Sequence, residues 1–316
     1  MTPTSADEIL PVLCLAGPTA SGKTALALSL AERLPCEIIN TDSRQVFRDF
    51  PLICAQPTPS EQAKCPHHLF GFLETSQKIN AGQWLNLALK EIRAVLGRGH
   101  VPLLVGGTGM YFQVLLHGLA PIPAISKKVK AEVEERLDRE GPLALHQELR
   151  RLDPEAAAKI HPHDRQRLGR ALEVYLETGE TLSCWQAKGQ SLAQRVQGPL
   201  LVLAPERAWL KERIARRITW MMNEGALEEA RRAYALCSDP AAPAWSGIGC
   251  AELLAHLLGR ISLTECLGLW QKNTQAYAKR QMTWFRGRLE AIFFSLEQGE
   301  DLLKAAQKSW AKLTNI

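Results

Sequence analysis

The sequence lacks the marks of several protein classes. Its eight cysteines are never closer than eleven residues apart, so no C-x-x-C pair exists and a compact zinc or iron–sulfur site is not expected. Cys14 and Cys266 stand in apolar surroundings, which is typical of reduced core thiols in a cytoplasmic protein. The first ten residues include Asp7 and Glu8 but no basic residue, which argues against a secretory signal.

Long uninterrupted hydrophobic runs are missing as well. Residues 99–126 lack Asp, Glu, Lys and Arg and are long enough to span a bilayer, but they contain five glycines and three prolines. This content favours buried strands and loops, so no membrane association is expected. With 316 residues, of which 46% are hydrophobic, the chain is large enough for a substantial core in one or two domains.

Charge of one sign is only slightly in excess. The chain has 38 Lys and Arg against 33 Asp and Glu, a net charge of +5. Residues 1–100 carry nine of each kind, so the basic excess lies in residues 101–316. An anionic partner for the second part of the chain is therefore permitted but not required.

Short apolar runs alternate with helical periodicity in the first 120 residues. We predict buried strands at residues 12–16, 37–40 and 101–105, and helices at residues 21–34 and 82–96. This order is typical of a doubly wound α/β core with a parallel sheet. The proline-rich residues 52–66 are predicted to form a long loop.

The texture of the sequence changes after residues 120–123. Residues 127–188 are charged and helical in period, and strand character returns at residues 199–203. We therefore expect a small helical domain, residues 122–197, inserted into an α/β core formed by residues 1–121 and 198–316. In the second part of the core we expect helices at about 207–236, 249–258 and 270–287, and a strand at 291–294.

A phosphate-binding loop is predicted between the first strand and the first helix. The pattern G-x-x-x-x-G-K-[ST] is matched by Gly17, Pro18, Thr19, Ala20, Ser21, Gly22, Lys23 and Thr24. Its glycines allow backbone N–H groups to surround phosphate oxygens at the N-terminus of a helix. Lys23 would neutralise the outer phosphate, and the Thr24 hydroxyl would hold Mg²⁺. The core is therefore expected to be P-loop NTPase-like, with a nucleotide or another polyphosphate, such as ATP, as its ligand.

Two polar residues follow the other predicted strands. Asp42 stands where ligands bind in parallel sheets, at the carboxyl end of a strand, and it could be a magnesium ligand, a general base or a helix N-cap. The strand at 101–105 ends in Gly106-Gly107-Thr108 and not in the metal-binding Asp of a conventional NTPase, which lowers the expectation of ATP hydrolysis. The Thr108 hydroxyl could meet the ligand or belong to a plain turn.

Basic residues recur in the second part of the chain. Arg167 and Arg170 are three positions apart on a predicted helix, where they could meet phosphates or form a solvated face. A later basic stretch is interleaved with Tyr277, Trp284 and Phe285. Charge combined with stacking suits nucleic acid, although core packing explains Trp284 and Phe285 equally well.

With these residues in place, the chain resembles the tRNA dimethylallyltransferase family, also called tRNA isopentenyltransferase or IPP transferase. The resemblance covers nearly the whole chain. It is carried, in the family's order, by the blocks GPTASGKT (17–24), DSRQVF (42–47), PLLVGGTGMY (102–111), IHPHDRQR (160–167), RALE (170–173) and AKRQMTWFR (278–286). This set is far more specific than the phosphate-binding loop alone.

The resemblance implies transfer of a dimethylallyl group from dimethylallyl diphosphate to N6 of the adenine 3′ of the tRNA anticodon, position 37. It implies that Asp42 is the general base, that Thr108 orients the reacting atoms and that Arg217 neutralises the diphosphate together with Lys23 and Mg²⁺. The helical domain would grip the anticodon stem-loop. No obligate protein partner is implied, and a monomer is expected. The tRNA-contacting residues would be Asp42, Ser43, Arg44, Gln45, Thr108, Lys130, Gln166, Arg167, Leu168, Gly169, Arg170, Ser246, Gly247, Ile248, Gly249, Cys250 and Ala251.

Some segments depart from the family pattern. A threonine and a lysine of the family pattern are missing from Ile53-Cys54-Ala55-Gln56-Pro57. The family usually has Gly-Tyr-Lys-Glu where this chain has Gly249-Cys250-Ala251-Glu252, and an arginine where it has Gln275.

Three other functions fit the sequence less well than prenyl transfer to tRNA. A P-loop small-molecule kinase would leave the helical insertion unexplained, and a prenyltransferase acting on free adenine nucleotide would not need the arginines of the insertion. An RNA-binding GTPase-like switch is disfavoured because no N-K-x-D motif occurs.

Overall fold

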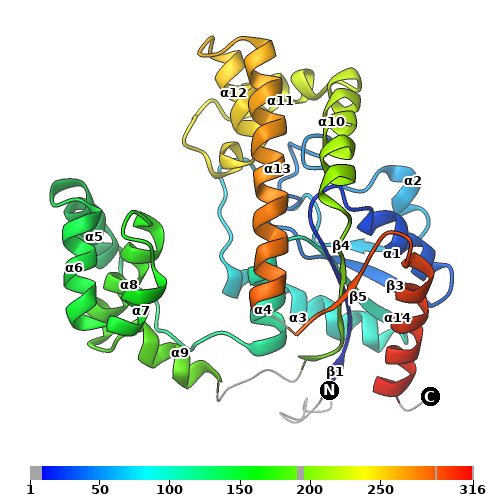
Figure 1. Cartoon of the computed structure of the whole chain (residues 1–316), viewed down its shortest axis with the longest axis horizontal. Helices are drawn as coiled ribbons and strands as arrows, with labels where there is room; N and C mark the ends of the chain where they lie inside the picture. Colours follow the sequence, from blue (N-terminus) through cyan, green and yellow to red (C-terminus); the bar gives the residue numbers. More distant parts are fainter. Residues whose placement is uncertain (1–8, 191–195, 289, 315–316) are drawn as a thin grey trace. The chain divides into compact units, whose positions relative to one another are not determined.

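The computed structural model describes residues 9–190, 196–288 and 290–314 (Figure 1). The chain divides into two compact units. One comprises Met1–Leu116 and Arg195–Ile316, and the other is His117–Gln194. The second unit therefore interrupts the sequence of the first.

A parallel sheet forms the centre of the first unit. Its strands lie in the order β4-β3-β5-β2-β7-β8, and every neighbouring pair is parallel. They are β2 (Leu13–Ala16), β3 (Cys36–Asn40), β4 (His67–His68), β5 (Val101–Gly106), β7 (Leu200–Leu203) and β8 (Ile292–Phe294). Two short strands, β1 (Leu10–Pro11) and β6 (Val196–Gln197), pair separately. The predicted α/β class with a parallel sheet is confirmed.

Different helices cover the two faces of this sheet (Figure 1). Leu13 and Leu15 pack with α1 (Lys23–Ala31) and α14 (Gly299–Thr314). On the opposite face, Cys14 and Ala16 pack with α3 (Ala81–Gly97) and α4 (Gly109–His117). Because both faces of β2, β5 and β7 are buried, these strands are continuous apolar runs in the sequence, which is why they could be predicted.

A third hydrophobic core joins residues 46–53 to the last large group of helices. This group consists of α10 (Arg207–Asn223), α11 (Ala226–Leu236), α12 (Cys250–Leu257) and α13 (Leu263–Arg288). The prediction of one helix over 207–236 is wrong, because Gly225 adopts φ 98° and separates α10 from α11. Several further elements were not predicted: the short strands β1, β4 and β6, the helices α2 (Pro59–Gln62), α4 and α14, and the 3₁₀ helix η1 (Pro243–Ser246).

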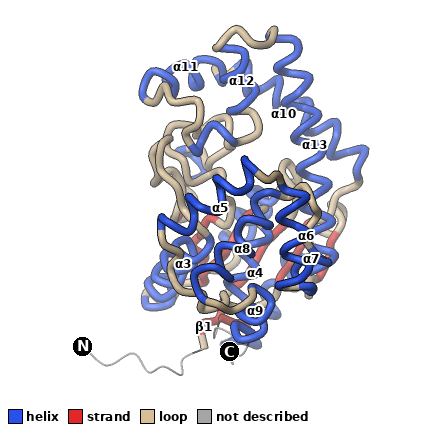
Figure 2. The backbone as a smooth tube through the Cα atoms, turned by 90° about the vertical axis from the view of Figure 1, so that its left-hand side faces the viewer, coloured by secondary structure: helices blue, strands red, loops and turns tan. Residues whose placement is uncertain are grey.

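Helices are the secondary-structure elements that the structure describes within the second unit, and loops join them (Figure 2). Leucines from α5, α6 and α8 form its core, among them Leu137, Leu145 and Leu168. Ser126 and Asp164 cap the N-termini of α5 and α8 by accepting backbone N–H groups. The helices are α5 (Lys127–Arg139), α6 (Pro142–Leu152), α7 (Pro154–Lys159), α8 (Arg165–Thr178) and α9 (Leu182–Gln190).

Three loops of the first unit meet at the carboxyl edge of the sheet. β2 leads into residues 17–24, β3 into residues 41–43 and β5 into residues 107–109. The register pairs Ala16 with Gly106 and Asn40 with Val105, so the three strands end side by side. Parallel sheets bind their ligands at this edge.

Candidate active site

The phosphate-binding loop turns tightly into the N-terminus of α1. Gly17 and Gly22 adopt φ of 153° and 98°, which L side chains rarely do. A Cβ on Gly17 would lie 2.6 Å from the Leu203 carbonyl oxygen, so the loop passes directly against β7. Lys23 Nζ donates to the carbonyl oxygens of Gly17 and Pro18 at 3.0 and 2.7 Å. The ammonium group therefore lies within the loop that would surround a phosphate.

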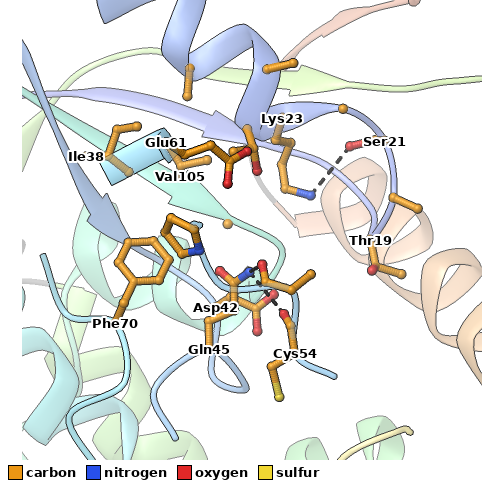
Figure 3. Close-up of a pocket in the computed structure, with 18 of the residues that line it drawn as sticks. Thr19, Ser21, Lys23, Ile38, Asp42, Gln45, Cys54, Glu61, Phe70 and Val105 are labelled. Carbon is orange, nitrogen blue, oxygen red and sulfur yellow. Dashed lines mark hydrogen bonds between the residues drawn. The ribbon is translucent and has the colours of Figure 1, made fainter. Parts of the chain in front are cut away.

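A cavity of about 240 Å³ opens beside this loop, and we call it the phosphate cavity (Figure 3). Lys23 and Asp42 lie on opposite walls of it. Partial burial lowers the pKa of Lys23 from 10.5 to about 8, with Asp42 raising it and Arg217 lowering it further. Lys23, Arg213 and Arg217 bring positive charge to the part of the cavity where a diphosphate would lie. Its other lining residues include Thr19, Thr24, Gln45, Cys54, Glu61, His67 and Phe70.

Asp42 is held in place by its neighbours on both sides. Asn40 Oδ1 accepts the Asp42 N–H at 2.8 Å, and Asn40 Nδ2 donates to the Asp42 carbonyl oxygen at 3.0 Å. Asp42 Oδ1 in turn accepts the Arg44 N–H at 2.8 Å. Residues 43–49 form turns and an isolated bridge, so the helix N-cap interpretation is wrong. The negative charge of the Asp42 carboxylate instead raises the pKa of Lys23, Arg217 and Tyr277.

Arg217 brings a second positive charge to the same place. It projects from α10 and its Nη2 donates to Thr19 Oγ1 at 3.3 Å. Burial lowers the pKa of its guanidinium, whereas the charge of Asp42 raises it. Lys23, Arg217 and Asp42 therefore form one compact charged group at the phosphate-binding loop.

Glycine is required where β5 ends and α4 begins, because the backbone and side chains of other segments approach these positions closely. A Cβ on Gly106 would lie 2.1 Å from the Thr41 carbonyl oxygen, and a Cβ on Gly109 would lie 2.2 Å from the Trp284 ring. Thr108 Oγ1 accepts the Ser43 N–H at 2.9 Å and donates to Ser43 Oγ at 3.2 Å. Thr108 is thereby hydrogen-bonded to Ser43, the residue that follows Asp42.

A second cavity of about 300 Å³ adjoins the first. The two share Thr19, Asp42, Cys54 and Arg217, so Asp42 and Arg217 lie at the boundary between them. The lining of the second cavity mixes aliphatic and aromatic side chains with about as many polar and charged ones. These include Ile53, Ile214, Ile218, Met221, Ile248, Trp270, Thr274, Tyr277 and Arg280. An apolar ligand group could therefore lie next to a bound diphosphate.

Two residues expected to contact tRNA make internal hydrogen bonds. Arg44 Nη2 donates to the Ala244 carbonyl oxygen at 2.5 Å, and its guanidinium occupies the space beside Gly247, where a Cβ would lie 2.6 Å away. Gln45 Nε2 donates to the Ala55 carbonyl oxygen at 2.5 Å. Arg44 also lines the second cavity and Gln45 lines the phosphate cavity, so both side chains form part of the cavity walls.

The remaining residues expected to contact tRNA differ in exposure. Ser246 and Ala251 are exposed, whereas Gly247, Gly249 and Cys250 are buried and Ile248 is half-buried. In the helical unit, Lys130, Gln166, Arg167 and Arg170 are exposed, but Leu168 and Gly169 belong to its core. Arg167 and Arg170 also pair with Asp164 and Glu173 at 3.4 and 3.5 Å. The side chains able to meet RNA directly are thus the exposed ones.

Two aromatic residues of α13, Trp284 and Phe285, pack against other parts of the protein, which is one of the two interpretations that the sequence left open. Phe285 is fully buried in the core beneath α3 and α4, and Trp284 packs on Gly109. The same helix carries a residue that sequence reasoning missed. Gln281 is buried, with hydrogen bonds to Thr19 and Gly107. A single glutamine beside a basic stretch has no pattern that would have revealed it.

Across the ranges that the structure describes, no cluster of three or more His, Cys, Asp or Glu side chains is arranged to hold a metal ion. Nor does any described helix combine the length and apolarity that a bilayer crossing demands. Thr24, whose hydroxyl the motif assigns to a magnesium ion, is exposed and lines the phosphate cavity.

Fold and site together define a P-loop α/β protein whose phosphate cavity adjoins a second cavity with both apolar and polar walls. The family model for IPP transferase matches residues 45–288. A protein from Desulfovibrio desulfuricans named tRNA dimethylallyltransferase is 53% identical over 299 residues, covering 95% of this chain and 92% of that protein. One of the same name from Parvibaculum lavamentivorans is 45% identical and covers 91% and 92%. The chain belongs to the IPP transferase family, and the predicted family is confirmed.

Solved structures agree with this assignment. The tRNA isopentenylpyrophosphate transferase of Bacillus halodurans superposes with a TM-score of 0.71 at 30% identity, covering 97% of this chain and 98% of that one. A eukaryotic dimethylallyltransferase acting on tRNA gives a TM-score of 0.80 at 27% identity, covering 96% and 80%. The fold therefore corresponds to that of these enzymes over almost the whole chain.

Proposed function

We propose that this enzyme transfers a dimethylallyl group from dimethylallyl diphosphate to N6 of adenosine 37 in tRNA and releases diphosphate. The observation that carries the proposal is that the phosphate cavity and the second cavity meet at Asp42 and Arg217. A donor with a charged end and a short apolar end, and an adenine with an exocyclic amine, could react at that boundary. Membership of the IPP transferase family supports the same reaction.

Departure of the diphosphate requires that its developing negative charge be neutralised. Lys23, Arg217 and the backbone N–H groups of the loop are positioned for this task. Mg²⁺ would be held by the Thr24 hydroxyl together with diphosphate oxygens and water, a ligand set that suits this ion. When bound, it would add positive charge at the leaving group.

An adenine N6 amine must lose a proton as its bond to carbon forms. Asp42 is the carboxylate at the boundary of the two cavities, and we assign it the role of general base. Thr108, hydrogen-bonded to Ser43 next to Asp42, would orient the reacting atoms. Ser43, Arg44 and Gln45 would border the adenine, because Ser43 and Arg44 line the second cavity and Gln45 lines the phosphate cavity.

Binding of the anticodon stem-loop is assigned to exposed residues of both units. Lys130, Gln166, Arg167 and Arg170 would meet its backbone from the helical unit. The segment Ser246–Ala251 would contact it from the first unit, through exposed Ser246 and Ala251. We place the enzyme in the cytoplasm as a monomer. The eight free cysteines support a reducing compartment.

Mass spectrometry of tRNA nucleosides tests the proposal. The protein is incubated with dimethylallyl diphosphate, Mg²⁺ and unmodified tRNA, and the digest is searched for N6-(dimethylallyl)adenosine. Parallel reactions replace tRNA with adenosine monophosphate, or the prenyl donor with labelled ATP. Product in tRNA alone supports the proposal. Modification of the free nucleotide, or phosphate transfer from ATP, would favour a rival function.

A further inference from the structure

Gln281 lies where three parts of the candidate active site meet. Its side chain is 5% exposed. Gln281 Oε1 accepts the backbone N–H of Thr19 at 2.9 Å, and its Nε2 donates to the Gly107 carbonyl oxygen at 2.8 Å. One buried amide therefore joins α13 to the phosphate-binding loop and to the loop that carries Thr108.

The space around this amide is closely fitted. A Cβ on Gly107 would lie 2.2 Å from Gln281 Nε2 and 3.2 Å from the Gly17 carbonyl oxygen. Any larger residue at position 107 would push the two loops and α13 apart. Because the amide is planar and both of its ends are bonded, it sets the two loops at one separation.

Thr19 extends the effect of Gln281 to the charged group. Its N–H is held by Gln281, while its hydroxyl accepts a hydrogen bond from Arg217 at 3.3 Å. The backbone of Thr19 therefore stands between the amide and the guanidinium that faces Asp42. A shift of the loop at Thr19 would move Arg217 as well as the phosphate-binding N–H groups.

We propose that Gln281 is a positioning residue that holds the diphosphate-binding loop, Arg217 and Thr108 in one fixed arrangement for group transfer. The inference rests on the proposed function and names a residue for that same site. Transfer requires the donor carbon and the acceptor nitrogen to approach within about 3–3.5 Å in line, and a misplacement of about 1 Å can lower the rate about 100-fold. Gln281 lines neither cavity, so it acts through the two loops to which it is hydrogen-bonded.

Replacing Gln281 with methionine tests this role. Gln281→Met has a side chain of similar length but leaves the Thr19 N–H and the Gly107 carbonyl without partners. Gln281→Asn keeps the amide, but it is one methylene too short to span both loops. Gln271→Met is the matched control, because Gln271 is a half-buried glutamine on the same helix that lies outside both cavities.

Three quantities are measured for each variant. They are kcat and KM for dimethylallyl diphosphate with tRNA as acceptor, the affinity for inorganic diphosphate with Mg²⁺ by calorimetry, and the affinity for tRNA by filter binding. For both Gln281 variants we expect kcat to fall about 100-fold and diphosphate affinity to fall about 10-fold, with tRNA affinity within about twofold of wild type. Gln271→Met should match wild type in all three.

A purely structural role would give a different result. The folded fraction of each variant is determined by circular dichroism and urea unfolding, and kcat is expressed per folded molecule. A Gln281 variant that unfolds more readily but keeps kcat within about threefold of wild type would overturn the proposal. So would equal losses in Gln271→Met. If wild-type protein does not prenylate tRNA, the proposed function fails, while an unchanged diphosphate affinity in Gln281→Met would by itself refute the positioning role.

Discussion

Replacing Asp42 with asparagine tests the proposed chemistry most directly. The introduced amide oxygen can still accept the Arg44 N–H, which Asp42 Oδ1 accepts at 2.8 Å, and the bonds from Asn40 involve only the backbone. The loop should therefore keep its geometry and tRNA should bind normally. The amide cannot take up a proton, so turnover should fall by about 10²–10⁴, the usual contribution of general base catalysis.

Asp42→Asn should also change the pKa of Lys23. Asp42 raises the pKa of Lys23, while burial and Arg217 lower it, and the balance is about 8. Without the carboxylate this pKa must fall further, so more of Lys23 is neutral at a given alkaline pH. Donor affinity in Asp42→Asn should therefore decline at a lower pH than in the wild type. The chemical step is best compared at about pH 6.5, where the lysine stays charged in both proteins.

Single-turnover measurements separate the base from its alternatives. Enzyme in excess is mixed with labelled dimethylallyl diphosphate and tRNA, quenched at intervals, and titrated with Mg²⁺. Asp49→Asn is the matched control, because Asp49 accepts the Thr75 hydroxyl at 2.7 Å and lies outside both cavities. It should retain a normal chemical rate. For Asp42→Asn, a rate within about threefold of wild type, or recovery with extra Mg²⁺, would refute the general-base assignment.

Four further outcomes are expected. Lys23→Ala should lower the transfer rate by about 10²–10³, measured in steady-state assays, with tRNA affinity within a few-fold. Because the pKa of Lys23 in the folded protein is about 8, below its ordinary 10.5, diphosphate affinity measured by calorimetry should weaken as pH rises above about 8, and this slope should vanish in Lys23→Ala. Replacing Arg167 and Arg170 with alanine should flatten the salt dependence of tRNA binding by about 1–2 units, whereas an unchanged slope would mean that both are merely solvated. Gly107→Ala should destabilise folding by about 1–3 kcal/mol in urea titrations, because its Cβ would meet Gln281.

Local sequence determined the features that depend on neighbouring residues. The apolar runs at residues 12–16 and 101–105 predicted buried strands because a strand covered on both faces has no polar side. The pattern of residues 17–24 predicted the phosphate-binding loop because its glycines and lysine act within a few residues of one another. Even there, a boundary differed: the helix begins at Lys23 and not at residue 21, because Gly22 adopts φ 98° and so lies outside the helix.

Tertiary structure decided which distant residues share the site. Strand order places Asp42 opposite Lys23, and α13 brings Gln281 to Thr19 across 262 positions of sequence. Arg44 resembled a free basic residue in the sequence, yet its guanidinium is bound to the carbonyl oxygens of η1. Periodicity and motifs record which face of an element is buried, but not which partner covers it. The partner is set by the packing of whole helices against the sheet, and so the two cavities and the amide between their loops appear only in the folded chain.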